Sequence, residues 1–136
     1  MVVGISSRIG KKHIIMLDYD CRMRKYVCAK VRKLQRLFSL PAFYVFRSSL
    51  KSYHAVCFRL VTKARLKKIF SVSGTDKLHR IYPDRVGYGT LRISRKKSLK
   101  SSVIKFVQVV PSRWQERVDL KRRYFEILGF EHGAKN

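Results

Sequence analysis

A change in the spacing of the apolar residues near the start of the chain constrains the fold more than any other feature. His13 to Leu17 is a short, largely apolar run, which is typical of a buried strand. From Asp20 to Phe38 the apolar residues recur every three or four positions, which is helical spacing. Because a strand pattern is followed directly by a helix pattern, the sequence predicts a mixed α+β fold.

The rest of the chain continues this alternation. The patterns predict two strands joined as a hairpin, a basic helix, two more strands and a last helix, at 42–47 and 53–58, 62–70, 90–94 and 103–110, and 112–128. Thr62 is a candidate N-cap, and Ser112 with Gln115 matches a capping box. The order β-α-β-β-α-β predicts an RRM-like or ferredoxin-like antiparallel sheet with helices on one face, plus the C-terminal helix. We expect one domain over residues 1–136.

The charge of the chain indicates its partner. It has 32 Lys and Arg against 8 Asp and Glu, a formal net charge of +24. Because such a charge opposes compaction, DNA or RNA is the first expected partner and an anionic membrane surface the second. No apolar run is long enough to span a membrane, and no secretory signal is visible. The 3 cysteines lack a CxxC pair, which favours free thiols and a reducing, cytoplasmic location.

Two of the few acids follow the first apolar run. Asp18 and Asp20 are separated by one residue, so in a continuous strand their side chains project from the same side. Two ionised carboxylates so close repel each other, and a divalent cation removes the conflict. Hard oxygen ligands suit Mg²⁺ or Mn²⁺. The alternative is that Asp20 caps the following helix and Asp18 pairs with a nearby Arg.

The expected hairpin carries a second polar group. Ser52 and His54 share a face of the second hairpin strand, and Lys51 and Arg47 lie close in sequence. A hydroxyl, an imidazole and two cations are donors suited to phosphate oxygens. The alternative is a core histidine held by one hydrogen bond.

A third group follows a loop. Asp84 precedes a glycine-containing turn, and Arg92 is expected in a strand with Lys96 just after it. Arg92 could bind a phosphate bidentately while Lys96 acts as a point charge. The alternative is a solvated basic edge. Further basic residues are predicted to follow a nucleic-acid backbone: Arg22, Lys25, Lys33, Arg36, Arg113 and Arg122.

Taken together, the three stretches resemble the archaeo-eukaryotic primase superfamily, which includes the primase-polymerases of plasmids and viruses. That family's first motif is a hydrophobic run followed by Asp-x-Asp or Asp-x-Glu, and IIMLDYD at 14–20 is similar to it. The second motif is Ser-x-His, which SYH at 52–54 matches. The third is an Asp with an Arg and a basic residue downstream, and Asp84 with Arg92 and Lys96 is the nearest fit.

The resemblance covers residues 13–98 and implies a function. It implies metal-dependent nucleotidyl transfer on a nucleic-acid template, with Mg²⁺ or Mn²⁺ held by Asp18, Asp20 and Asp84. Nucleoside triphosphates would be the substrates, and a replication helicase of a plasmid or virus on a separate chain would be a partner. Because Asp84 follows a proline where the family has an apolar residue, Asp76 is the alternative third ligand.

Two other classes of function remain open from the sequence. A non-catalytic, RRM-like nucleic-acid-binding module, including a degenerate relative of the primases, explains the charge equally well. A nicking replication initiator or an RNA-cleaving nuclease is a third reading. A nicking enzyme needs paired histidines and a tyrosine nucleophile, but Val56 stands two residues after His54 and the candidate nucleophile Tyr124 lies in a helix pattern.

Overall fold

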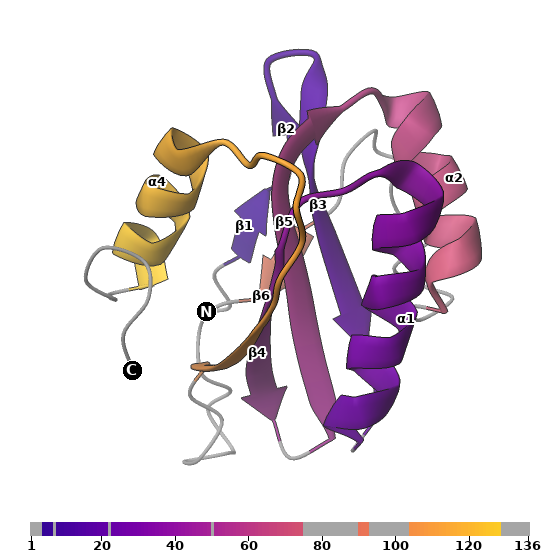
Figure 1. Cartoon of the computed structure of the whole chain (residues 1–136). Coiled ribbons are helices and arrows are strands. Elements are labelled where there is room, and N and C mark those ends of the chain that lie inside the picture. Colours follow the sequence, from indigo (N-terminus) through magenta and orange to yellow (C-terminus); the bar gives the residue numbers. More distant parts are fainter. Residues whose placement is uncertain are drawn as a thin grey trace.

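The fold is an antiparallel sheet with two helices on one face and a third helix on the other (Figure 1). The computed structural model describes residues 4–6, 8–21, 23–49, 51–74, 90–92 and 104–128. The elements are β1 Gly4–Ser6, β2 Arg8–Ile9, β3 Lys12–Tyr19, α1 Arg24–Phe38, β4 Phe43–Ser49, β5 Ser52–Val61, α2 Lys63–Ser73, β6 Thr90–Arg92, β7 Lys105–Val110 and α4 Val118–Leu128. The predicted α+β class is confirmed.

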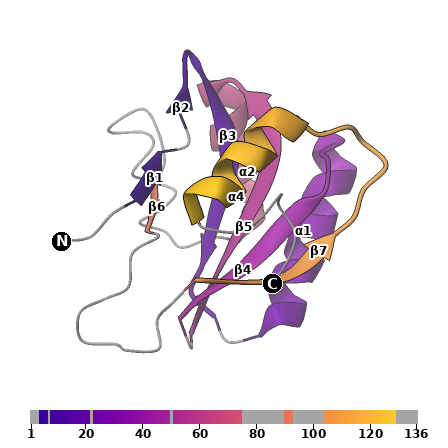
Figure 2. The same ribbon diagram turned by 90° about the vertical axis from the view of Figure 1, so that its left-hand side faces the viewer.

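The main sheet has five strands in the order β2-β3-β5-β4-β7, and every neighbouring pair is antiparallel. β1 and β6 form a separate antiparallel pair. β6 lies close to β3, and Figure 2 shows the small pair on the β2–β3 side of the molecule. The predicted hairpin is present as β4 and β5, and both of its strands extend beyond the expected bounds.

The RRM-like strand order is the part of the fold prediction that is not confirmed. From β3 to α2 the elements follow the expected sequence of strand, helix, two strands and helix. A split βαβ sheet then returns its last strand beside the first. Here β7 pairs with β4 at the opposite edge, because the β3 side of the main sheet already carries β2.

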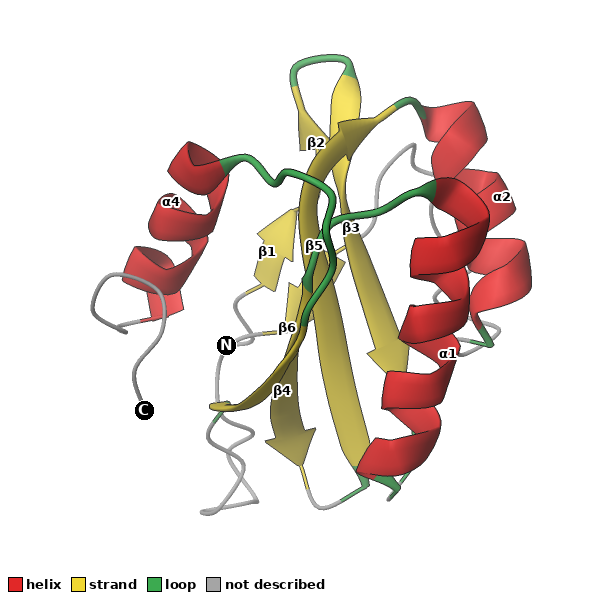
Figure 3. Cartoon of the chain, viewed as in Figure 1, coloured by secondary structure: helices red, strands yellow, loops and turns green. Residues whose placement is uncertain are grey.

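The two helices that follow β3 and β5 cover the same face of the sheet (Figure 3). Their apolar stripes bury Val27, Val31 and Leu34 from α1 and Leu66, Ile69 and Phe70 from α2 against alternate residues of β3, β4 and β5. Thr62 caps α2 as predicted, because its Oγ1 accepts a hydrogen bond from the Arg65 backbone N–H at 3.2 Å.

The start of α1 differs from the expectation. The helix begins at Arg24, and its N-cap is Met23, whose side chain makes no capping hydrogen bond. Asp20 therefore does not cap this helix. The reason is that β3 continues through Tyr19, whose hydroxyl donates to the Ser73 carbonyl oxygen at 2.8 Å, so the chain turns only after this residue.

The opposite face of the sheet packs against α4 through aromatic rings. The six rings come from β4, β5, β7 and α4: Tyr44, Phe46, Phe58, Phe106, Tyr124 and Phe125. Several neighbouring ring centroids lie 5.5 to 5.8 Å apart in tilted or edge-to-face arrangements, which aromatic pairs prefer. α4 is thus held by a second, largely aromatic core.

The last helix begins later than predicted. α4 starts at Val118, and the proposed capping box of Ser112 and Gln115 is wrong. The Ser112 hydroxyl instead donates to the Leu40 carbonyl oxygen at 2.7 Å and accepts from the Trp114 backbone N–H at 3.3 Å. The linker between β7 and α4 comprises residues 111–117. Its last residue is held against the sheet, because the Arg117 backbone N–H donates to the Phe58 carbonyl oxygen at 2.8 Å.

Within the described part of the chain, no helix combines the length and the apolar character needed to cross a bilayer.

Candidate active site

Asp18 and His54 are brought together by the pairing of β3 with β5. They are direct partners in the antiparallel register, so their side chains project from the same face. The His54 Nε2 atom lies 3.6 Å from the Asp18 Oδ1 atom, which is a close electrostatic contact slightly longer than a hydrogen bond. The His54 side chain is 5% exposed and that of Asp18 is 33% exposed. The carboxylate is therefore open to solvent, with the imidazole buried beside it.

Four of the predicted phosphate donors lie in or close to the β4–β5 turn: Arg47, Lys51, Ser52 and His54. Ser52 begins β5 two residues before His54, and its Oγ atom lies 2.9 Å from the Ser48 Oγ atom. Lys51 is exposed in the turn, and Arg47 lies half-buried at the end of β4, opposite Tyr53. Ser52 thus shares the face of His54 and Asp18, whereas Arg47, as the direct partner of Tyr53, projects from the opposite face of the sheet.

Asp20 lies just beyond the end of β3 and is exposed. It lines a shallow hollow of about 350 Å³ between the start of α1 and the end of α2, bounded also by Tyr26, Met23 and Gly74. Asp18 shares the other face of the sheet with Met16 in the alternation of β3. Whether Asp18 and Asp20 share one cation stays a prediction.

The third acidic ligand and part of the phosphate site fall on other segments. Asp84, its alternative Asp76, and Lys96 lie outside the described residues, as does Arg22. Arg92 lies in β6, for which the backbone is described, and this strand approaches β3. Among the described residues, no three His, Cys, Asp or Glu side chains are gathered so that they could hold a metal ion.

The accessible carboxylate nevertheless suits a divalent cation. Mg²⁺ is usually bound by one or two carboxylates, with waters and substrate phosphates completing its shell. Asp18 offers one such carboxylate, and Ser52 and Lys51 lie at the start of β5 and in the turn before it. Binding of a divalent cation together with a triphosphate at this carboxylate stays a prediction.

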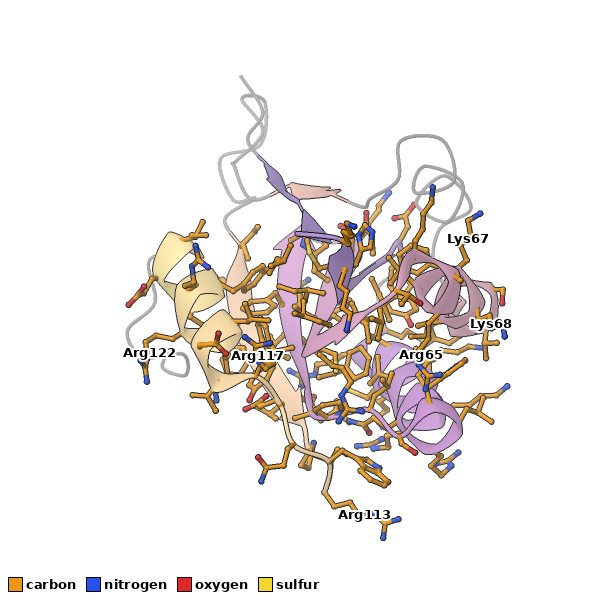
Figure 4. All side chains as sticks on the ribbon, turned by 90° about the horizontal axis from the view of Figure 1, so that it is seen from above. Arg65, Lys67, Lys68, Arg113, Arg117 and Arg122 are labelled. Atoms are coloured by element: carbon orange, nitrogen blue, oxygen red, sulfur yellow. The ribbon has the colours of Figure 1, made fainter. Side chains whose placement is uncertain are left out.

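Basic side chains are exposed on the helices of both faces of the sheet. Lys25, Lys33 and Arg36 on α1 are exposed, as are Arg113 in the linker and Arg122 on α4, so these predicted backbone contacts are accessible. Figure 4 shows a further group around α2, where Arg65, Lys67 and Lys68 lie on the far side of the molecule from Arg122.

The sequence reading missed one feature of this surface. A hollow of about 520 Å³ lies between the end of α1 and the linker after β7, and Arg32, Arg36, Arg113 and Trp114 are among the residues that line it. The signal in the sequence was the single tryptophan of the chain, which directly follows Arg113 in a polar stretch.

Tyr124 is placed where it cannot act as a nucleophile on DNA. Its side chain is 3% exposed within the aromatic core, and burial raises the pKa of its hydroxyl. The tyrosine required by the nicking-enzyme reading is therefore inaccessible in this structure.

Comparison with protein-family models, with curated proteins and with solved structures finds no match for this chain.

Proposed function

We propose that this chain is a metal-dependent nucleotidyltransferase of the primase-polymerase type, acting on nucleic acid with nucleoside triphosphates as substrates. The observation that carries the proposal is the direct pairing of Asp18 with His54 on neighbouring strands, beside the serines and cations of the β4–β5 turn. The proposal is supported by the first two primase-like stretches, whose Asp18 and His54 are separated in the chain but are neighbours across β3 and β5.

The residues divide into two roles. Asp18, with Asp20 and Asp84, would hold Mg²⁺ or Mn²⁺, and the ion would supply activation of a 3′-hydroxyl and stabilisation of the leaving pyrophosphate. The phosphate oxygens accept hydrogen bonds from the side chains predicted for this purpose: Ser52, His54, Lys51, Arg47, Arg92 and Lys96. Since His54 is buried beside Asp18, it also orients the carboxylate through the contact between Nε2 and Oδ1.

In the proposed reaction, the hydroxyl oxygen of the growing strand forms a bond to the α-phosphorus of the incoming nucleotide. The bond from this phosphorus to the pyrophosphate breaks, and the hydroxyl proton passes to solvent. The template backbone is bound by the exposed cations of α1, the linker and α4. We further infer that the sheet is a rearranged RRM-like sheet, supported by the shared element order from β3 to α2.

An incorporation assay tests the proposal. Wild-type protein, labelled nucleoside triphosphates, Mn²⁺ and single-stranded DNA should give a labelled strand, and Asp18→Ala should abolish it. Asp119→Ala is the matched control, because this carboxylate lies exposed on α4 and pairs with Arg117 at 2.9 Å. Absence of incorporation by the wild type, or equal incorporation by Asp18→Ala, would count against the proposal.

A non-catalytic nucleic-acid-binding module is the second candidate. It is favoured by the exposed cations of α1, the linker and α4, which can bind a phosphate backbone without any metal. Thermal unfolding with Mn²⁺ separates the two: stabilisation that is lost in Asp18→Ala supports the enzyme. Unchanged melting with intact DNA binding supports the module.

A further inference from the structure

We propose that the hollow at the end of α1 is a binding site for single-stranded nucleic acid, in which a base stacks on Trp114 and the neighbouring phosphates contact Arg32, Arg36 and Arg113. This site rests on the proposed function for its partner, and it places two of the template-binding cations, Arg36 and Arg113, in a defined hollow away from Asp18. It also needs neither metal nor nucleotide.

Trp114 is exposed in a way that packing does not explain. Its side chain is 40% exposed, and it belongs to neither hydrophobic core. The Arg113 guanidinium carbon lies 5.1 Å from the centre of its ring, a cation–π contact that leaves indole surface facing outward. Proteins that bind single strands of any sequence combine aromatic side chains with nearby cations, because every base can stack on an aromatic ring.

The charge of the hollow suits a polyanion. Three arginines line it, from two segments far apart in sequence, and the described lining residues include no Asp or Glu. Guanidinium groups bind phosphate bidentately, so three of them around one aromatic face can hold a nucleotide and its neighbours. A volume of about 520 Å³ lies within the usual range for small-ligand sites.

The floor of the hollow is fixed by buried hydrogen bonds. Gln35 is 8% exposed, and its Nε2 donates to the carbonyl oxygens of Val110 at 2.9 Å and Pro41 at 3.2 Å. Ser112 donates to the Leu40 carbonyl oxygen and accepts from the Trp114 backbone N–H. These bonds tie the end of α1 to the linker, so the backbone that carries Trp114 and the arginines is held in place without a ligand.

The hollow lies at the opposite end of α1 from Asp20. A helix of 15 residues is about 22 Å long, so a strand held at Trp114 would need several nucleotides to reach Asp18. The site would therefore anchor a strand at a distance from the proposed chemistry, and its occupation should not depend on Asp18.

The single tryptophan provides a direct probe. Titration with a short oligothymidylate, without metal or nucleotide, should quench the Trp114 fluorescence saturably. A strand of equal length that lacks bases has the same phosphates, and it should bind more weakly and leave the emission nearly unchanged. Equal quenching by both strands, or none by either, would overturn the proposal. A response to anionic phospholipid vesicles but not to the oligonucleotide would overturn it in favour of a membrane surface.

Variants test the same site through affinity, measured with a labelled oligothymidylate. Trp114→Ala should weaken binding roughly 5- to 100-fold, and Trp114→Phe should restore part of the loss. Arg36→Ala should weaken binding more than Arg24→Ala, which removes an equal charge from the same helix outside the hollow. Equal effects of the two arginines, or no effect of Trp114→Ala, would contradict the site. Asp18→Ala should bind normally, so failure here is distinct from failure of the proposed catalysis.

Discussion

His54 lies directly opposite Asp18 across the β3–β5 pairing, with its Nε2 atom 3.6 Å from the Asp18 Oδ1 atom. A buried imidazole next to a solvent-accessible carboxylate restricts the positions that the carboxylate can take. This contact links the two motifs on which the proposed nucleotidyl transfer depends.

Replacing His54 should impair the proposed reaction without unfolding the sheet. His54→Gln should lower nucleotide incorporation about 10- to 100-fold, because residues that orient a metal ligand typically have effects of this size. His13→Gln is the control, since His13 is also buried on β3 but pairs with Val61 at the far end of the strand. Equal losses in both variants, at matched thermal stability, would show that His54 has no special role.

Glu116 should stabilise the packing of the linker before α4 against the sheet. The Tyr44 hydroxyl donates to the Glu116 carboxylate at 2.8 Å, and the Lys121 ammonium donates to it at 3.0 Å. Glu116→Ala leaves both donors without this acceptor in a half-buried setting, so we expect a loss of roughly 1–3 kcal/mol in the free energy of unfolding. Urea denaturation measures it.

The matched variant for Glu116→Ala is Asp119→Ala, which breaks the exposed pair with Arg117 and should leave the unfolding midpoint unchanged. A larger loss from Asp119→Ala than from Glu116→Ala would contradict this account of the linker.

Stability should fall steeply at high pH. Burial, aided by the hydrogen bond to Glu116, raises the pKa of Tyr44 from 10.0 to about 12. The folded state thus favours the neutral phenol. Its stabilisation is complete below about pH 10 and is lost as the pH rises toward about 12. Burial also raises the pKa of Tyr19 and Tyr124.

Urea unfolding at a series of pH values checks this prediction. Tyr44→Phe should reduce the steepness of the decline above about pH 10. A free energy of unfolding that stays constant through this range would contradict the burial of these hydroxyls.

The aromatic core should be required for the docking of α4. Phe125 is fully buried there, so Phe125→Ala should cost about 3–5 kcal/mol in the free energy of unfolding. Ile127 on the same helix is 59% exposed, and Ile127→Ala should change stability little. Similar costs for the two substitutions would mean that α4 does not pack as described.

Local signals in the sequence predicted those elements whose stabilising contacts are local. Thr62 caps α2 through a residue three positions away, and the periodicity of α1 follows from its own apolar residues. Ser112 shows the limit of such signals. Its hydroxyl bonds to the carbonyl of Leu40, which is distant in sequence, and this contact replaces the capping box that the pattern suggested.

The alternation of apolar residues within a strand does not determine which neighbour the strand pairs with in the sheet. The alternation of β7 shows which residues face the core, but not whether the strand joins the sheet at β3 or at β4. The same holds for the pairing of Asp18 with His54, which depends on the register of two strands separated by a helix and another strand. The motifs indicated the residue types, and the three-dimensional pairing placed them together.

Sequence patterns did not predict the hollow at Trp114 for a similar reason. Arg36 was predicted as a backbone contact from charge alone, and Arg113 likewise. Their shared position with Trp114 results from packing the end of α1 against the linker through Gln35.

The most direct test of the proposed site is the effect of Mn²⁺ on the imidazole proton resonances of His54, in the presence of a nucleoside triphosphate. The resonances are assigned by comparison with His54→Gln. Because a bound paramagnetic ion broadens nearby protons most, we predict strong broadening of the His54 signals in the wild type and its loss in Asp18→Ala, with the more distant His13 signals broadened far less. Sharp His54 signals at saturating Mn²⁺, or broadening that persists in Asp18→Ala, would contradict a metal–nucleotide site at this pair.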